Sequence, residues 1–176
     1  MRSDNYGLLQ LYYGNGKGKT SAAVGQAVRA AGNGFAVFFM QLLKDSSKSG
    51  ELKILSTIKN VTCEVFGTGE FLSLRSLTDK DRLFANQAMA RIESLILNRS
   101  HDILIIDEIG AAIELGLVDK STLRDLLKKA SGWLDVVLTG HSFPEEIMDL
   151  AATVTRLKAV RHHYDSGIPA RRGIEY

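Results

Sequence analysis

The residues with the clearest chemical potential form one short run, in which glycines surround a lysine and a hydroxyl residue. The run consists of Gly14, Asn15, Gly16, Lys17, Gly18, Lys19, Thr20 and Ser21. Glycines let successive backbone N–H groups turn inward around an anion, Lys19 can reach phosphate oxygens as a point charge, and the Thr20 hydroxyl can ligate Mg²⁺. The run follows a β-prone segment and opens a helical one, which is the context that a phosphate-binding loop requires. We therefore predict that these residues bind a nucleotide.

The glycine spacing departs from the usual phosphate loop. The common pattern, G-x-x-x-x-G-K-[ST], places its first glycine at position 13 when it is aligned on Lys19. This chain has Tyr13 there, and its glycine follows at Gly14. Ordinary kinases and GTPases are therefore a poorer match than the Gly-Lys-Thr tripeptide alone indicates.

A second candidate group is an acidic pair that follows four apolar residues. The run from Ile103 to Ile106 predicts a buried strand, and Asp107 and Glu108 come directly after it. In an open α/β sheet, ligands bind at the carboxyl ends of the strands. Asp107 can hold a metal-bound water or pair with Thr20 or Lys19, and Glu108 can ligate Mg²⁺ directly. The alternative is that the pair caps the next short helix.

Segments that predict strands alternate with segments that predict helices. Apolar or β-prone runs predict strands over residues 8–13, 35–42, 62–66, 103–106, 136–138 and 154–160. Helical spacing and end signals predict helices over 19–31 and 51–58, after the Thr78–Asp81 capping box, around Leu123, Leu126 and Leu127, and after Pro144. This order predicts an α/β fold with three layers and a mostly parallel central sheet, as in P-loop NTPases of the RecA-like type. The length, 176 residues, predicts a single domain over 1–176.

The charge balance and the cysteine count of the chain limit the kinds of molecule that it can be expected to bind. The chain has 22 Lys and Arg against 20 Asp and Glu, a net charge of +2, which gives no case for a dedicated nucleic-acid or membrane-surface binder. Cys63 is the only cysteine, which excludes an internal disulfide framework and favours a reducing cytoplasm. No apolar stretch approaches the ~20 residues of a membrane span. We expect a cytoplasmic protein that acts on small molecules.

Together these motifs resemble the ATP:corrinoid adenosyltransferases of cobalamin biosynthesis and salvage. The run from Gly14 to Thr20 resembles that family's phosphate loop, including its shifted first glycine. The other similar segments are Arg29-Ala30-Ala31-Gly32, Gln41 with Lys44, Gly50-Glu51-Leu52-Lys53, Ile106-Asp107-Glu108-Ile109, Leu138-Thr139-Gly140, Val160-Arg161-His162, Gly167-Ile168 and Gly173-Ile174-Glu175-Tyr176. The resemblance runs from about Leu8 to Tyr176.

The resemblance implies a specific reaction and a role for each candidate residue. The family transfers the 5′-deoxyadenosyl group of ATP to the Co(I) of a reduced corrinoid, and triphosphate leaves. By resemblance, Lys19, the loop N–H groups and Mg²⁺ hold the triphosphate, Thr20 and Glu108 hold the metal, and Lys19 and Glu108 are the catalytic candidates. Arg29 matches a position that contacts the nucleotide, and Phe71 matches an aromatic position on the corrinoid side. The resemblance also implies a homodimer and a flavoprotein reductase that supplies Co(I).

The chain differs from the family pattern at several positions. His141 stands where the family has arginine, Ala152 and Arg156 stand where it has acidic residues, and the tryptophan expected near Phe71 is missing. These differences leave the ATP half of the expected site complete. They leave open an altered corrinoid preference or a weak activity.

Two other classes of function fit the residues taken by themselves. A RecA-like ATPase that couples hydrolysis to a partner would use the same phosphate loop, but the near-neutral charge counts against a nucleic-acid partner. A small-molecule kinase would need an arginine-rich lid, for which Arg75 and Arg82 are the candidates.

Overall fold

The six strands of the described residues form one fully parallel sheet. In the computed structural model, residues 7–45, 49–69 and 77–174 are described. The strands are β1 (Leu9–Tyr13), β2 (Val37–Leu42), β3 (Val61–Phe66), β4 (Ile103–Asp107), β5 (Asp135–Gly140) and β6 (Thr153–Arg156). The helices are α1 (Lys19–Gly32), α2 (Gly50–Leu55), α3 (Asp79–Asn98), α4 (Ile109–Glu114), α5 (Lys120–Ala130) and α6 (Glu145–Met148), and a 3₁₀ turn, η1 (His163–Ser166), follows β6.

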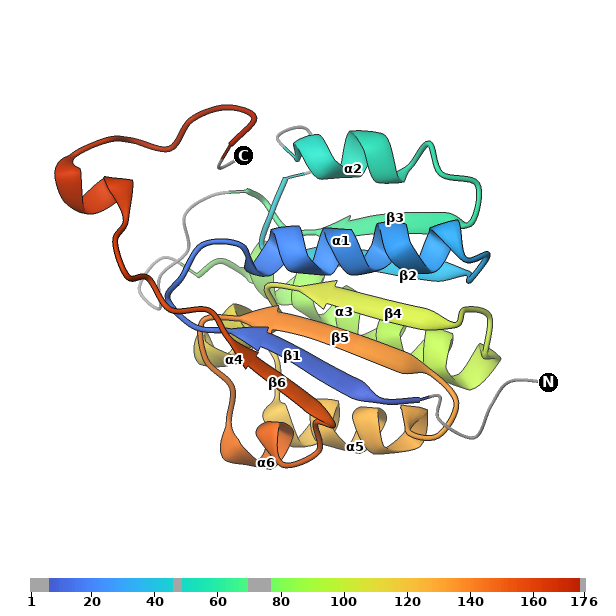
Figure 1. Cartoon of the computed structure of the whole chain (residues 1–176). Helices are drawn as coiled ribbons and strands as arrows, with labels where there is room; N and C mark the ends of the chain where they lie inside the picture. The colour runs from blue at the N-terminus through green and yellow to red at the C-terminus, as the bar shows by residue number, and fades with distance from the viewer. Residues whose placement is uncertain (1–6, 46–48, 70–76, 175–176) are drawn as a thin grey trace.

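Helices cover both faces of the sheet, because successive residues of each central strand point to opposite sides. In β2, Phe38 and Met40 pack with α3 and the helices that follow it, whereas Val37 and Phe39 pack with α1 and α2. The same alternation divides the buried residues of β4 between the two clusters. Figure 1 shows α1 and α2 on one side of the sheet and α3, α4, α5 and α6 on the other. The predicted three-layer, P-loop NTPase-like fold is confirmed.

The strand order determines which loops meet. The order is β3-β2-β4-β5-β1-β6, so β5 lies between the strand before the glycine run and the strand before the acidic pair. All neighbouring strands are parallel, and their carboxyl ends therefore lie at one edge of the sheet (Figure 1). The residues after β1, β4 and β5 converge at this edge.

Most predicted element ends agree with the structure to within a few residues. The capping box is present, with Thr78 Oγ1 accepting from the Asp81 N–H and the Asp81 carboxylate accepting from the Thr78 N–H. The prediction for the last strand, 154–160, is wrong in length, because β6 ends at Arg156. Leu157 still donates its N–H to Tyr13 O, and the chain then turns toward the glycine run. Among the helices of the described segments, none combines the length and apolarity needed to cross a bilayer.

Candidate nucleotide site

The glycine run forms a tight loop between β1 and α1, and the lysine at its end is folded back on the loop. Tyr13 is the last residue of β1, and Gly18 precedes α1 with a φ of 109°. Lys19 Nζ donates to Gly14 O at 2.8 Å and to Gly16 O at 2.9 Å. These carbonyl contacts hold the ammonium beside the loop, where phosphate oxygens would compete for it.

The loop rests on the residues that follow β5 and β6. Gly14 N–H donates to His141 O and Gly16 N–H donates to Leu157 O, at 3.0 and 2.9 Å. Asn15 Oδ1 accepts from the Ala159 N–H at 3.2 Å. The N–H groups of Gly14 and Gly16 are therefore used to support the loop. The donors best placed for a phosphate are the N–H groups of the first turn of α1, which have no intrahelical acceptor.

We expect Gly14→Ala to destabilise the fold, because Gly14 has no room for a side chain. Its φ is 115°, and a Cβ there would lie 2.3 Å from Leu157 O. A strained, clashing residue costs about 1–3 kcal/mol or more of unfolding free energy. Gly25→Ala is the matched control, since a Cβ on this exposed face of α1 meets nothing within 4 Å and should stabilise the helix by about 0.5–1 kcal/mol. Urea unfolding checks both. Equal effects of the two substitutions would contradict this description of the loop.

Asp107 is the centre of a hydrogen-bond network behind the loop. Its carboxylate is fully buried and accepts from Thr20 Oγ1 at 3.0 Å, from Thr139 Oγ1 at 2.7 Å and from Lys44 Nζ at 2.8 Å. Gln41 Nε2 donates to it at 3.2 Å. Of the two pairings left open by the sequence, Thr20 rather than Lys19 makes the contact. The network fixes the start of α1 to the end of β4.

Glu108 faces the loop and does not cap the helix that follows it. Its φ is 65°, and its side chain makes no capping hydrogen bond to α4. It lines a cavity of about 260 Å³ together with the loop, Thr20, Ser21, His162 and Ile174. Burial and the neighbouring Asp107 carboxylate raise the pKa of Glu108, although Lys44 and Lys19 partly oppose this. A cation bound beside Glu108 would stabilise its ionised carboxylate.

Glu108→Gln should make the protein without ligand more stable near pH 7. A raised pKa means that the folded protein favours the neutral carboxyl, so stability falls as pH rises from the ordinary glutamate pKa through the raised one. Glutamine stays neutral throughout, and we expect its melting temperature to exceed that of the wild type by about 2–4 °C at pH 7. The gain should vanish below the ordinary glutamate pKa. Thermal unfolding followed by circular dichroism at both pH values checks this, and a lower melting temperature at pH 7 would refute it.

The donor set suits Mg²⁺ better than a transition metal. Mg²⁺ is commonly held by one or two carboxylates, with phosphate and water oxygens completing its octahedron. Thr20, Glu108 and the buried Asp107 supply oxygens at one edge of the sheet. Within the described part of the chain, no group of three or more His, Cys, Asp or Glu side chains is arranged to hold a metal by itself. A metal at this edge would depend on oxygens from a bound phosphate.

Comparison with known proteins decides the family. Residues 5–176 match the family of ATP:corrinoid adenosyltransferases BtuR/CobO/CobP. The chain belongs to this family. It is a transferase, as its resemblance to corrinoid adenosyltransferases predicted.

Individual relatives agree over nearly the whole chain. A corrinoid adenosyltransferase of Escherichia coli is 29% identical over 173 residues, covering 98% of this chain and 87% of the relative. The corrinoid adenosyltransferase CobA of Salmonella typhimurium is 30% identical over 170 residues, with 97% and 86% covered. The flagellar accessory protein FlaH of Methanocaldococcus jannaschii shares the fold, with a TM-score of 0.59 at 16% identity, covering 86% of this chain and 71% of that one.

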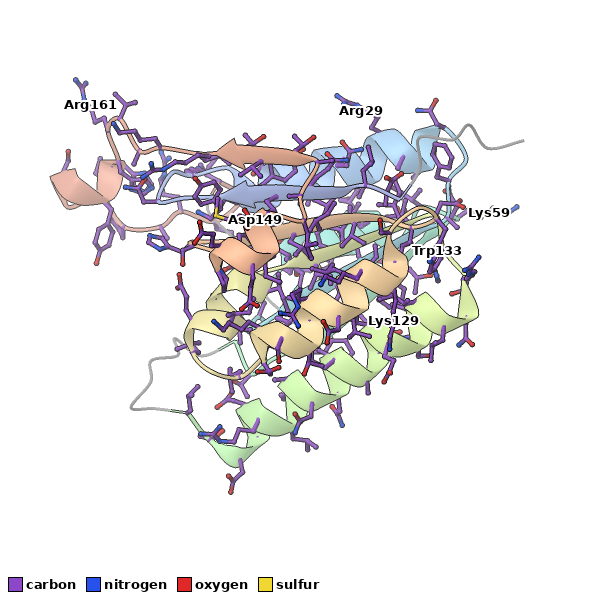
Figure 2. All side chains as sticks on the ribbon, turned by 90° about the horizontal axis from the view of Figure 1, so that it is seen from below. Arg29, Lys59, Lys129, Trp133, Asp149 and Arg161 are labelled. Atoms are coloured by element: carbon purple, nitrogen blue, oxygen red, sulfur yellow. The ribbon has the colours of Figure 1, made fainter. Side chains whose placement is uncertain are left out.

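Two of the candidates drawn from the adenosyltransferase pattern lie away from this cavity or outside the described residues. Arg29 is exposed in the last turn of α1, ten residues beyond Lys19, and Figure 2 shows its side chain directed away from the sheet. Ten residues of helix span about 15 Å, so Arg29 does not reach the loop, and its nucleotide contact stays a prediction. Phe71 lies outside the described residues.

Of the three positions that differ from the adenosyltransferase pattern, His141 and Arg156 lie beside the loop and Ala152 lies away from it, and none of them lines the phosphate-loop cavity. His141 supports Gly14 through its carbonyl, while its exposed ring lies 3.8 Å from the Glu114 carboxylate. Arg156 ends β6. Ala152 lines a different cavity, formed by residues such as Leu9 and Leu134. None of these substitutions disturbs the contacts of Lys19, Thr20 or Glu108.

The structure adds residues that we did not predict as part of the site. Lys44, Gln41 and Thr139 contact Asp107 directly, and His162 lines the cavity of the phosphate loop. Gln41 had a usable signal, because it is the one polar residue in the fully buried strand β2. Thr139 had a similar one near the end of β5. His162 had only its similarity to the adenosyltransferase pattern, since its place depends on the path of the chain after β6.

Proposed function

We propose that this protein transfers the 5′-deoxyadenosyl group of ATP to the Co(I) of a reduced corrinoid and releases triphosphate. The observation that carries the proposal is the cavity lined by Lys19, Thr20, Glu108 and the rest of a phosphate loop of the adenosyltransferase type. In this reaction Co(I) donates an electron pair to the ribose 5′ carbon. The bond from that carbon to oxygen breaks, its electron pair leaves with triphosphate, and the cobalt is formally oxidised to Co(III).

The residues of the cavity fit the binding of a highly charged leaving group. Lys19 would exchange its contacts with Gly14 O and Gly16 O for phosphate oxygens, and the N–H groups at the start of α1 would hold the same group. Charge that develops on the triphosphate is stabilised where these donors are already in place. The cobalt nucleophile carries no proton, so no residue has to act as a general base.

Mg²⁺ is the proposed metal, and Thr20 and Glu108 are its proposed ligands. When bound, Mg²⁺ supplies positive charge that neutralises the triphosphate. Asp107 positions Thr20 through the 3.0 Å hydrogen bond, while Glu108 faces the cavity without a hydrogen bond from any described side chain. The remaining task of the chain is to hold ATP and the corrinoid in line for attack.

We further propose the setting in which the reaction occurs. The single cysteine, half-buried Cys63, suits a reducing cytoplasm. A flavoprotein reductase would supply the Co(I) form, and the enzyme would act as a homodimer. The reaction would be a step of cobalamin biosynthesis or salvage. These proposals rest on the family to which the chain belongs.

The test is an anaerobic assay with Mg²⁺ and chemically reduced cobalamin, followed by absorption spectroscopy. Addition of ATP should replace the Co(I) spectrum with that of an alkylated, light-sensitive corrinoid. Illumination should then destroy the new species, because a cobalt–carbon bond is photolabile. A Co(I) spectrum that persists at high enzyme concentration with several corrinoids would reject the proposal.

A further inference from the structure

A lysine contacts the side chains that are proposed to hold or orient the metal. Lys44, which follows β2, donates from Nζ to Asp107 Oδ2 at 2.8 Å and to Thr20 Oγ1 at 3.4 Å. Asp107 is completely buried, whereas 30% of the Lys44 side chain is exposed. A partly exposed cation is thus paired with a fully buried anion.

The contact with Thr20 uses the oxygen that a metal would need. Thr20 gives its hydroxyl hydrogen to Asp107, so the oxygen lone pairs are its remaining binding capacity. The Lys44 ammonium approaches this same oxygen as a donor. A divalent cation at Thr20 would meet both the occupied oxygen and the positive charge of Lys44. Lys44 and the metal therefore compete for one place.

A second acceptor for Lys44 lies next to the first. Glu51 Oε1, at the start of α2, is 3.7 Å from Lys44 Nζ. Gln41 Nε2 donates to the same Glu51 oxygen at 2.8 Å, and Gln41 Oε1 accepts from Ser49 Oγ at 2.9 Å. Burial alone would raise the pKa of Glu51, but its hydrogen bonds and the Lys44 charge lower it, so Glu51 remains an anion. Gln41 also bonds to Asp107 and so holds the two acceptors in a fixed relation.

There is room for the ammonium to move between these acceptors. A cavity of about 440 Å³ is lined by Thr20, Ser21, Lys44, Glu51 and Ile174, among others. It adjoins the cavity of the phosphate loop, since Thr20, Ser21 and Ile174 line both. Movement of Lys44 from Asp107 toward Glu51 would keep its charge paired throughout.

We propose that Lys44 competes with the divalent metal for Thr20 and yields that place by moving from Asp107 to Glu51 when metal and nucleotide bind together. The proposal rests on the metal site suggested above. Its consequence is that the protein binds the metal weakly by itself and takes it up as the metal–nucleotide complex. Lys44 is thus a positioning residue that discourages metal loading before ATP arrives.

Binding of Mn²⁺ in the absence of nucleotide tests the competition. The free Mn²⁺ signal in electron paramagnetic resonance measures affinity without any turnover. Lys44→Met removes one positive charge a few ångströms from the metal site, and we expect about tenfold tighter Mn²⁺ binding than in the wild type. Lys53→Met, which replaces an exposed lysine of α2, is the charge-matched control and should change nothing. If Lys44→Met does not fold, Lys44→Gln keeps a donor for Asp107 and should show the same direction.

The second acceptor is tested by Glu51→Gln. Here Lys44 loses its alternative anion, so calorimetric affinity for Mg·ATP should fall about tenfold, while Mn²⁺ binding without nucleotide should not strengthen. Mn²⁺ affinity that is unchanged or weaker in both Lys44 variants would overturn the proposal. So would a Glu51→Gln protein with wild-type affinity for Mg·ATP. None of these measurements contains a corrinoid, so they stand apart from success or failure of adenosyl transfer.

Discussion

Replacement of Lys19 by alanine should abolish productive ATP binding. Lys19 Nζ lies within the phosphate loop, held by Gly14 O and Gly16 O, and Lys19 lines the cavity together with Glu108. Charge-assisted hydrogen bonds to phosphate contribute roughly 1.5–3 kcal/mol each. Loss of two such bonds weakens binding by about a hundredfold or more. Isothermal titration calorimetry with Mg·ATP measures the effect directly.

The matched control for Lys19 is Lys59→Ala. Lys59 is exposed, and Figure 2 shows it at the far end of the molecule from Arg161, which lies beyond β6. It loses the same charge without touching the loop, so its affinity for Mg·ATP should equal that of the wild type. Wild-type affinity in Lys19→Ala itself would show that this loop does not bind the triphosphate.

The second large effect is expected from Glu108→Gln, which should lower turnover at least a hundredfold while ATP binding changes only a few-fold. The loop, Lys19 and the start of α1 still hold the phosphates, so ground-state binding survives. The lost carboxylate charge would instead misplace the metal relative to the charge that develops on triphosphate. Turnover is measured with reduced cobalamin, and affinity by calorimetry with Mg·ATP.

Together with the stability gain predicted for the same variant, this result would show that Glu108 is kept at a cost to the fold. The control is Glu93→Gln, an exposed carboxylate on α3 that should alter neither turnover nor melting temperature. Unchanged turnover of Glu108→Gln at saturating Mg²⁺ would mean that Glu108 has no role in the chemistry.

Local signals in the sequence were enough to predict the strands and most of the helices of this fold, but not the short helix α4 or the 3₁₀ turn η1. The apolar run from Ile103 to Ile106, the capping box at Thr78 and the glycine run before Lys19 each determine a strand, a helix start or a turn through short-range physics. The end of β6 was missed because Leu157 leaves the sheet to support the loop, which is a tertiary contact. No local pattern encodes such a departure.

The site was predictable only where residue type is itself informative. The glycine run with Lys19 and Thr20 predicts a phosphate site from one short segment. An acidic pair after an apolar strand likewise predicts a metal ligand at the end of that strand. The contact between Thr20 and Asp107 depends on the strand order, in which β5 separates β1 from β4. Lys44 reaches Asp107 because β2 lies beside β4, with Gln41 in register with Asp107. These neighbours follow from topology, which single-residue patterns do not specify.

The identity of the phosphate product distinguishes adenosyl transfer from hydrolysis or transfer of the γ-phosphate. Attack at the ribose 5′ carbon releases triphosphate, whereas an ATPase or kinase cleaves at the γ-phosphorus. We therefore predict that ³¹P NMR of an anaerobic reaction with Mg·ATP and reduced cobalamin shows triphosphate formed in step with the cobalt–carbon bond, and no comparable amount of ADP. A slow rate would not matter for this result. ADP and orthophosphate, formed without any cobalt–carbon bond while reduced cobalamin is present, would contradict adenosyl transfer and favour the ATPase function.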